Sequence, residues 1–309
     1  MNKNIKLLLL LFALLIVPFS SIKASETETI INSKYSTDKK NVVFDIINKQ
    51  NHYYIDTKIG DDSVRFMLES GTSFLLMSEE IYEKIKNNPK IKFNLRESKT
   101  RIVAYNDESR AKYRGHCMMK IGNMCYDGPV IIGGKRKYVE LPIQHIKHAK
   151  NKIRYITIDL QSKKLIIHHK RTKNHSNKSL NFTLDSLENI IVNLEINFTN
   201  YKSDICLSGD YMLDLGNANV LFLNSHNTEV NNYIALGKIK LDIAKDKQGN
   251  EIGKGIFAQK INILGNEFKN MSIGITKHTI NDSSIGYIGF RAFARSVTFD
   301  FEKNKLYFW

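Results

Sequence analysis

The sequence contains little cysteine and little proline. It has three cysteines, Cys117, Cys125 and Cys206, and four prolines among 309 residues. Three thiols form at most one disulfide within a chain, which excludes a framework of several disulfides and leaves at least one thiol over. A tight turn at residues 122–123 pairs Cys125 with Lys120 rather than with Cys117. We therefore predict free thiols that behave as small apolar residues.

The sequence also lacks an apolar run long enough to span a bilayer. Residues 7–17 are apolar, but a spanning helix needs about 20 such residues. Lys3 and Lys6 precede this run, and small and polar residues follow it up to Ala24, as in a secretory signal peptide. An uncleaved N-terminal anchor is the alternative. A bacterial lipid anchor is not indicated, because it needs a cysteine at the cleavage site and none lies near it. We expect export to the periplasm or extracellular space, with no transmembrane segment after signal removal.

Acidic residues are scarce relative to basic ones. The 31 Asp and Glu face 46 Lys and Arg, which gives a formal charge of +15. Most of the basic residues are lysines spread along the chain, so we interpret them as a solvated basic surface. Such a surface can also steer acidic substrates or adhere to anionic envelope surfaces. The sequence has no nucleic-acid motif, and the expected export argues against a nucleic-acid partner.

The residues that are abundant favour β-structure. The chain is 42% hydrophobic, which is enough for one or two ordinary cores. Its seventeen glycines and frequent Tyr, Phe, Ile and Val favour short strands and turns. We also expect a short helix beginning after Ser78, because a capping serine and two acids open residues 78–85.

Two short stretches, residues 66–73 and 211–218, share one pattern. Each is an apolar strand that runs into an acid, Glu69 or Asp214, followed two positions later by glycine. A buried carboxylate shifts its pKa or finds polar partners, and glycine lets the backbone turn sharply and pass close to another chain segment. The repeat predicts a duplicated lobe in which two acids face each other.

Further pairs of segments support the duplication. Residues 121–123 resemble residues 264–266, and residues 155–160 resemble residues 296–301. The pairs occur in the same order and at nearly the same spacing as the two acid-containing stretches. Internal repeats of this kind predict two similar lobes in one chain.

These motifs resemble those of the pepsin/retropepsin superfamily of aspartic peptidases, and most of all its exported bacterial members. The resemblance covers roughly residues 42–309 and includes the apolar-apolar-Gly element at residues 285–290. It implies an all-β fold of two similar β-barrel lobes with a central cleft and few short helices. It also implies a monomer without cofactor or metal. The expected organisation is signal peptide 1–24, polar leader 25–41, N-terminal lobe 42–168, basic linker 169–179 and C-terminal lobe 180–309.

By this resemblance, Glu69 and Asp214 are the catalytic dyad. Two such carboxyl groups share one proton, and one acts as general base on a water while the other acts as general acid. The supporting positions that the resemblance implies are Ser70, Gly71, Ser73, Leu215, Gly216, Ala218 and Gly289. The Ser70 hydroxyl is expected to reach the opposite turn and hold the two turns together.

The family's flap, a hairpin that closes over substrate, corresponds to residues 100–115. Tyr105 is the candidate for its aromatic tip, with Tyr113 as the alternative. An ordinary exposed loop tyrosine remains the third interpretation. The histidine pairs His145/His148 and His168/His169 lack a further acid or thiol at ligand spacing, so we interpret them as surface histidines and predict no metal site.

Three departures from the family pattern bear on activity. Glu69 stands where the family has Asp and is one methylene longer, and a misplacement of about 1 Å costs on the order of a hundredfold in rate. Leu215 has no hydroxyl, so half of a reciprocal lock between the turns is missing. A constant spacing between the repeats also places His148 where the C-terminal repeat has Gly289. A histidine there blocks close backbone approach, unless the alignment of the repeats slips by a few residues.

Two functions from different classes are compatible with this pattern. The departures favour a non-catalytic descendant whose inter-lobe cleft binds extended polypeptide through main-chain hydrogen bonds and side-chain pockets. The retention of an acid at both positions favours an active aspartic endopeptidase that uses Glu69 and Asp214 on a shared water. A secreted structural β-protein without a ligand is the third possibility, because a fold alone does not define a function.

Overall fold

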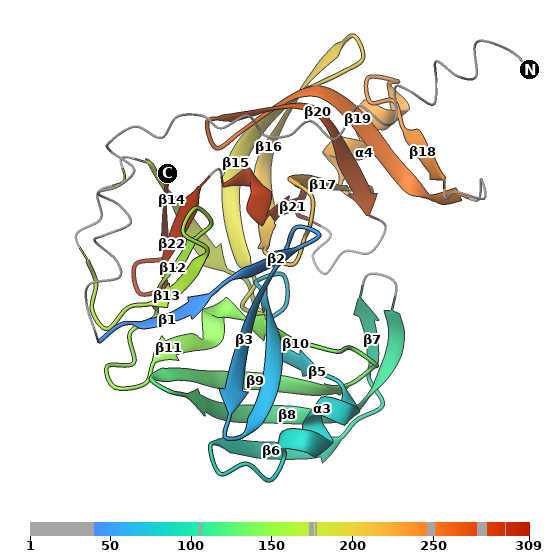
Figure 1. Cartoon of the computed structure of the whole chain (residues 1–309). Coiled ribbons are helices and arrows are strands. Elements are labelled where there is room, and N and C mark those ends of the chain that lie inside the picture. The colour runs from blue at the N-terminus through green and yellow to red at the C-terminus, as the bar shows by residue number, and fades with distance from the viewer. Residues whose placement is uncertain are drawn as a thin grey trace, which may run out of the picture. The chain divides into compact units, whose positions relative to one another are not determined.

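A computed structural model describes residues 40–104, 107–172, 176, 178–245, 251–276, 283–293 and 295–309 (Figure 1). All of these residues belong to one compact unit, Lys39–Trp309. The predicted signal peptide, residues 25–39 of the predicted leader and the flap candidate Tyr105 lie outside the described residues.

The described residues form two β-sheets with few helical segments, which confirms the predicted all-β class. The helical elements within them are α3 (Glu79–Ile85), α4 (Thr228–Ala235) and the 3-10 turns η1 (Ile143–His145) and η2 (Phe290–Ala292). Helix α3 begins as expected, because Ser78 Oγ accepts a hydrogen bond from the Ile81 amide at 3.3 Å.

The first sheet has ten strands, all from the N-terminal half. Its main path runs β2-β3-β4-β10-β5-β9-β8-β6, while β11 pairs with β9 and β7 pairs with β8. The strands are β2 (Ile47–Lys49), β3 (His52–Ile59), β4 (Asp62–Glu69), β5 (Leu75–Met77), β6 (Ile91–Glu97), β7 (Arg101–Ala104), β8 (Asp107–Ile121), β9 (Met124–Gly133), β10 (Val139–Pro142) and β11 (Ile146–His148).

The second sheet has thirteen strands. Its order is β1-β13-β12-β22-β23-β14-β15-β16-β21-β17-β20-β19-β18, and β15 also pairs with β19. The strands are β1 (Val42–Asp45), β12 (Tyr155–Asp159), β13 (Lys164–Ile167), β14 (Lys178–Leu184), β15 (Ile190–Asn200), β16 (Ser203–Asp214), β17 (Leu221–Asn224), β18 (Asp242–Lys245), β19 (Glu251–Ile263), β20 (Asn266–Thr276), β21 (Gly286–Gly289), β22 (Ser296–Asp300) and β23 (Lys305–Phe308).

Burial along the strands explains where the acids sit. In β3 the side chains of Tyr53, Ile55 and Ile59 point into the core, with more exposed residues between them, as expected of a strand with one face in water. In β4 burial becomes continuous over its last four residues, because both faces are covered there. Glu69 therefore ends its strand inside the fold.

The duplicated hairpins of the sequence occur in both halves. Strands β8 and β9 are joined at Gly122, and β19 and β20 at Gly265, and both glycines have the positive φ that such tight turns require. The hairpins β12–β13 and β22–β23 pair with each other through β12 and β22. At the centre of that pairing, the hydroxyls of Thr157 and Thr298 are 2.7 Å apart. Because one sheet joins both hairpins, the lobe boundaries at residues 168 and 180 stay predictions.

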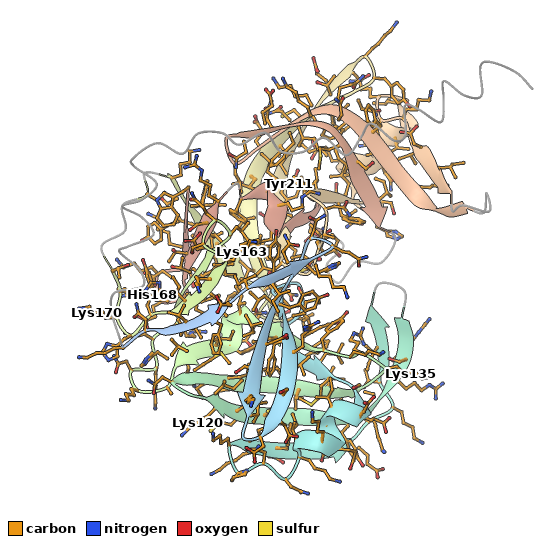
Figure 2. All side chains as sticks on the ribbon, in the orientation of Figure 1. Lys120, Lys135, Lys163, His168, Lys170 and Tyr211 are labelled. Carbon is orange, nitrogen blue, oxygen red and sulfur yellow. The ribbon has the colours of Figure 1, made fainter. Side chains whose placement is uncertain are left out.

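Lysine side chains illustrate the expected basic surface. Lys120, Lys135, Lys163 and Lys170 are exposed, whereas His168 and Tyr211 are fully buried (Figure 2). Among the described segments, no helix combines the length and the apolar character that a membrane crossing demands.

The cysteine predictions are confirmed in part. All three cysteines are free thiols, and Cys125 lies opposite Lys120 across the β8–β9 turn, as predicted. Burial raises the pKa of Cys117 to about 12, and the nearby Cys125 and Asp127 add to the effect. Cys117 and Cys125 are buried, but Cys206 is exposed on β16, so the interpretation as a buried apolar residue is wrong for Cys206.

Candidate active site

Two strands end in the two acids, and each is covered by a parallel neighbour. Strand β4 delivers Glu69 beside β10, with Glu69 opposite Pro142. Strand β16 delivers Asp214 beside β21, with Asp214 opposite Gly289. The same local arrangement thus occurs twice, and the turns that follow the two strands meet. We call residues 69–75 and 214–220 the N-terminal and C-terminal dyad turns.

Glu69 uses its extra methylene to contact both dyad turns. Its Oε1 atom accepts hydrogen bonds from the amides of Ser70 at 2.8 Å and Gly71 at 2.7 Å in its own turn. The same atom accepts a third hydrogen bond, from the amide of Gly216 in the opposite turn, at 3.2 Å. Only 7% of Glu69 is exposed, so these donors replace water around that oxygen.

Asp214 lies beside Glu69 and shares a side-chain hydrogen bond with it. The Asn217 amide donates to the Asp214 carbonyl oxygen at 3.1 Å, and the nearby backbone amides of Gly216 and Asn217 lower the pKa of the Asp214 carboxyl group. Asp214 is partly exposed, whereas Glu69 is buried. The structure therefore brings the two predicted acids together as a hydrogen-bonded pair.

The glycines of the two turns make room for the two carboxyl groups. A Cβ atom on Gly216 would lie 1.8 Å from Glu69 Oε2, and one on Gly71 would lie 2.8 Å from Asp214 Cγ. Each glycine thus faces the acid of the opposite turn. The close approach of backbone to carboxyl, rather than a special φ, explains why glycine occupies both positions.

Both carboxyl groups hold protons more tightly than isolated acids. Burial raises the pKa of Glu69 well above its ordinary value, and the charge of Asp214 and the hydrogen bond between the two acids raise it further. Burial also raises the pKa of Asp214, and the hydrogen bond from Glu69 works against this increase. Because both pKa values are raised and the two carboxyl groups share a hydrogen bond, the two acids hold one proton between them, and its titration belongs to the pair.

Ser70 connects the two dyad turns. Its hydroxyl donates to the Leu213 carbonyl at 2.8 Å and accepts from the Leu215 amide at 3.0 Å. Leu215, at the corresponding position of the C-terminal turn, is a buried side chain without a hydroxyl. A side chain of the N-terminal turn therefore bonds the backbone of the C-terminal turn, and Leu215 makes no such bond in return.

A solved structure resembles this fold. The aspartic proteinase from Irpex lacteus matches with a TM-score of 0.51, over 86% of this chain and 96% of its own, at 9% sequence identity. The fold is that of an aspartic proteinase. No family model and no curated protein sequence matches the chain. At this low identity, the similarity establishes the fold, and any activity has to be argued from the site.

The prediction that His148 corresponds to Gly289 across the repeat is wrong. The residue that corresponds to Gly289 is Pro142, because Pro142 lies opposite Glu69 just as Gly289 lies opposite Asp214. Both residues are followed by a 3-10 turn, η1 or η2. The spacing between the repeats changes along the chain, so a constant shift selects the wrong residue. His148 instead lies in β11, with its Nε2 atom 3.1 Å from the Lys40 carbonyl oxygen.

The interpretation of the histidines as surface residues is also wrong. His148 and His168 are fully buried, and the side chain of His145 is 9% exposed. His168 Nε2 lies 2.8 Å from the hydroxyl of Thr157 on β12, the strand that pairs with β22. In the described residues, no group of three or more His, Cys, Asp or Glu side chains is arranged to hold a metal ion.

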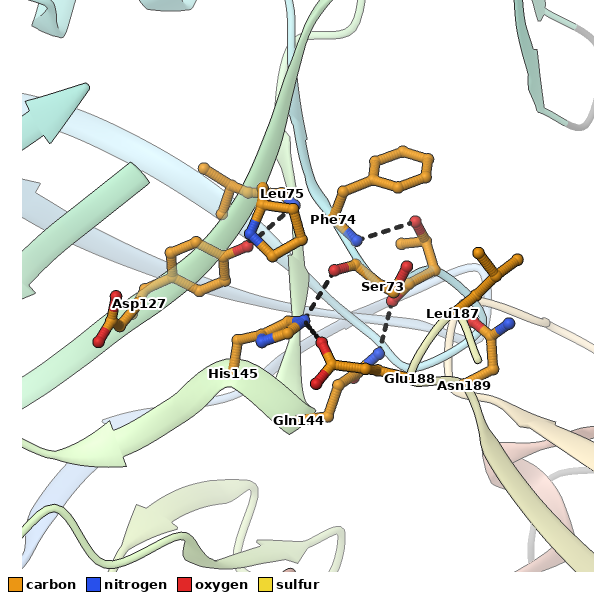
Figure 3. A network of polar contacts seen from close by, with 12 residues as sticks. Ser73, Phe74, Leu75, Asp127, Gln144, His145, Leu187, Glu188 and Asn189 are labelled. Carbon is orange, nitrogen blue, oxygen red and sulfur yellow. Dashed lines mark hydrogen bonds and ion pairs between the residues drawn. The ribbon is translucent and has the colours of Figure 1, made fainter. Parts of the chain in front are cut away.

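Sequence reasoning missed the residues that hold the N-terminal dyad turn from the other side. Gln144 Nε2 donates to the Thr72 carbonyl at 2.7 Å, and His145 Nε2 lies 2.7 Å from the Ser73 carbonyl oxygen (Figure 3). Ser73 therefore contributes to the site through its backbone. The available signal was the position of Gln144 and His145 directly after β10, the strand that runs beside the Glu69 strand.

The remaining predicted positions are Ala218 and the two candidates for the flap tip, Tyr105 and Tyr113. Ala218 is a partly buried small residue in the C-terminal dyad turn. The predicted flap is a hairpin of β7 with the start of β8, and Tyr105 falls in the part of it that is not described. Tyr113 lies well inside β8, between Glu97 of β6 and Ile132 of β9, so it is not at the hairpin tip.

Proposed function

We propose that this protein binds extended polypeptide between its two halves, at the Glu69/Asp214 pair, and that its hydrolysis of peptide bonds is weak or absent. The fold it shares with an aspartic proteinase supports polypeptide as the ligand class. Main-chain hydrogen bonds with alternating side-chain pockets are the mode by which such a site recognises an extended chain. We expect a monomer, and neither nucleic acid nor a cofactor takes part in this function.

The position of the Glu69 carboxyl group carries this proposal. A general base needs an oxygen within about 2.6–3.2 Å of the water that it activates. Glu69 Oε1 already accepts three backbone hydrogen bonds, and Oε2 lies against Gly216. The longer side chain thus directs its carboxyl group towards backbone amides, which occupy the positions from which Oε1 would accept a proton from a water. Leu215 lacks the hydroxyl that Ser70 has, and Pro142 stands where the C-terminal half has Gly289.

One observation favours a second candidate, an active aspartic endopeptidase. Hydrolysis by two acids requires one proton shared between them, so that one is a base while the other is an acid. The raised pKa values of Glu69 and Asp214 and their mutual hydrogen bond supply that condition. In this candidate, Asp214 as carboxylate activates the water and protonated Glu69 donates to the scissile carbonyl.

Incubation of the purified mature protein with a mixed peptide library, from acid to mildly alkaline pH, tests both candidates. Retention of peptides without cleavage is the expected result. Cleavage that pepstatin inhibits and that an Asp214→Ala variant lacks would instead establish the endopeptidase. An Asp210→Ala variant is a matched control, because Asp210 lies on the same strand, four residues before the dyad acid. Neither retention nor cleavage at any pH would refute both candidates.

We further propose that the protein acts outside the cytoplasm, after removal of residues 1–24. The charged, apolar and small-residue order of that segment supports export. Mass spectrometry of the protein recovered from its native host gives the N-terminus. A mature chain beginning near Ser25 is expected, and a chain that retains Met1 contradicts cleavage.

A further inference from the structure

A second link between the two halves lies directly behind the N-terminal dyad turn. His145 Nε2 lies 2.7 Å from the Ser73 carbonyl oxygen and 3.2 Å from Glu188 Oε2 (Figure 3). Ser73 belongs to the dyad turn, whereas Glu188 lies in the loop between β14 and β15 of the C-terminal half. Both partners accept hydrogen bonds, so the neutral ring carries its proton on Nε2. One imidazole thus joins the dyad turn to the opposite half.

The loop that presents Glu188 is fixed by its own hydrogen bonds. Asp185 Oδ1 accepts from the amides of Leu187 at 2.8 Å and Asn189 at 2.9 Å, and the Glu188 amide donates to the Asp185 carbonyl at 2.9 Å. Glu188 itself has φ +62°, a left-handed conformation that non-glycine residues rarely adopt. Residues in such conformations persist where the surrounding structure fixes them, often at functional positions. These bonds fix the backbone that carries Glu188, while its side chain is 53% exposed and meets the His145 ring at the surface.

The His145 ring is held equally firmly. A Cβ atom on Gly128 would lie 2.7 Å from His145 Cγ and 2.9 Å from its Nδ1, so the ring packs directly on this glycine of β9. The Tyr126 ring packs edge-on against it at 5.8 Å. Tyr126 also contacts the dyad turn, because its hydroxyl lies 3.1 Å from the Leu75 amide. The ring can therefore neither rotate nor withdraw without disturbing the turn.

Within the described residues of the C-terminal half, no side chain makes an equivalent link. Gly289 approaches the C-terminal turn with backbone alone, since a Cβ atom there would lie 1.8 Å from the Asn219 carbonyl oxygen and 2.7 Å from that of Asn217. In η2, which corresponds to η1, the position of His145 is taken by Ala292. The side-chain link is thus specific to the turn that carries the unusual Glu69.

We propose that His145 is a positioning residue of the N-terminal dyad turn, which it holds against the C-terminal half by joining the Ser73 carbonyl to the Glu188 carboxylate. The inference rests on the proposed function in one respect only, that this turn belongs to the polypeptide-binding site. Burial disfavours a charge on this ring, and a protonated ring would carry its second hydrogen on Nδ1, the ring atom that faces Gly128 and not water. The hold on the turn is consequently strongest when His145 is neutral.

The charges around the His145 ring set the pH at which the ring takes up a proton. Burial lowers the pKa of His145, and Arg154 beside β12 lowers it further, whereas Glu188 and Asp127 of β9 raise it. Asp127 is itself paired with Lys147 and His116. A histidine whose folded-state pKa lies below the unfolded value of about 6.5 stabilises the fold above that value and loses this contribution as pH falls. The turn should therefore loosen in mildly acidic solution.

Hydrogen exchange of the amides of residues 70–77, corrected for intrinsic rates, tests this role in the wild type and four variants. His145→Gln keeps a donor for Ser73 but does not titrate, and His145→Leu removes the donor. Glu188→Gln removes the charge that raises the ring's pKa. Gly128→Ala displaces the ring by adding a methyl group and changes no polar group. It therefore shows the effect of moving the ring without altering its chemistry. All variants are first checked for unchanged exchange in β22 and β23, which reports whether they fold.

At about pH 7.5 we expect His145→Leu to exchange on the order of tenfold faster in this segment, and His145→Gln to match the wild type. Between about pH 7.5 and pH 5 the wild type should lose protection relative to His145→Gln, and in Glu188→Gln this loss should shift to lower pH. Gly128→Ala should exchange faster than the wild type at both values. Parallel pH profiles for the wild type and His145→Gln, or an unchanged turn in His145→Leu, would refute the positioning role.

Peptide retention measured on the same proteins separates the two proposals. If exchange changes as expected while no variant retains peptide, the positioning role stands and the proposed function fails. If the wild type retains peptide and His145→Leu shows neither altered retention nor altered exchange, the proposed function stands and the positioning role fails.

Discussion

The hydroxyl of Ser70 lies 3.0 Å from the backbone nitrogen of Leu215, in the opposite dyad turn. The same hydroxyl donates to the Leu213 carbonyl, so one side chain satisfies two backbone groups of the other half. Ser70 is fully buried, and no solvent competes for either bond. The two dyad turns are thus held together by a residue that is adjacent in sequence to Glu69.

Replacement of Ser70 by alanine should destabilise the protein by about 2 kcal/mol, because a buried amide and a buried carbonyl lose their partner. Urea denaturation of the wild type and Ser70→Ala at one pH measures the difference. Ser70→Thr retains the hydroxyl and should lose much less stability. Equal loss in both variants would show that space, and not the hydroxyl, matters at this position.

Shortening Glu69 to aspartate should withdraw the carboxyl group from the Gly216 amide and free the space for a water. If the longer acid is the defect, peptide cleavage in Glu69→Asp rises, on the order of a hundredfold over the wild type. Adding Leu215→Thr, which restores a hydroxyl to the second turn, should raise it further. A library digest by both variants makes the measurement, and two inert variants would favour a binding protein.

The pH dependence of stability should show the raised pKa of Glu69. Its folded-state pKa lies above the unfolded value, so its contribution is present in full below the unfolded pKa and is lost as pH rises through the folded-state pKa. Glu69→Gln keeps an oxygen for the three amides and removes the titration. The variant should be more stable than the wild type at about pH 8, with the difference shrinking towards about pH 4. A difference that does not change with pH would contradict the assignment.

Gly289→Ala should be among the most damaging single substitutions in the chain. The added Cβ would meet the backbone oxygens of Asn217 and Asn219, which no side-chain rotation relieves. We expect a loss of about 3 kcal/mol in thermal or chemical unfolding. Pro142→Ala, at the corresponding N-terminal position, is the matched comparison and should change stability by no more than about 1 kcal/mol. Similar costs for the two would contradict the close backbone approach that distinguishes Gly289 from Pro142.

The amino-acid sequence by itself determined the local elements and their duplication. Apolar alternation gave β3 and β4, the Gly-containing turns gave the β8–β9 and β19–β20 hairpins, and the Ser78 cap gave helix α3. It also placed an acid at the end of β4 and of β16. These features depend on periodicity and turn chemistry within a few residues, so they are visible without the partner strands.

Only the tertiary structure decided which residues correspond across the repeat and what the acids contact. The counterpart of Gly289 is Pro142 and not His148, because correspondence follows the parallel pairing of β10 with β4 and not a constant sequence spacing. The bond from the Gly216 amide to Glu69 and the link from His145 to Glu188 join segments far apart in the chain. Such contacts form only when two separately folded segments are packed against each other. No local pattern of residues encodes that packing.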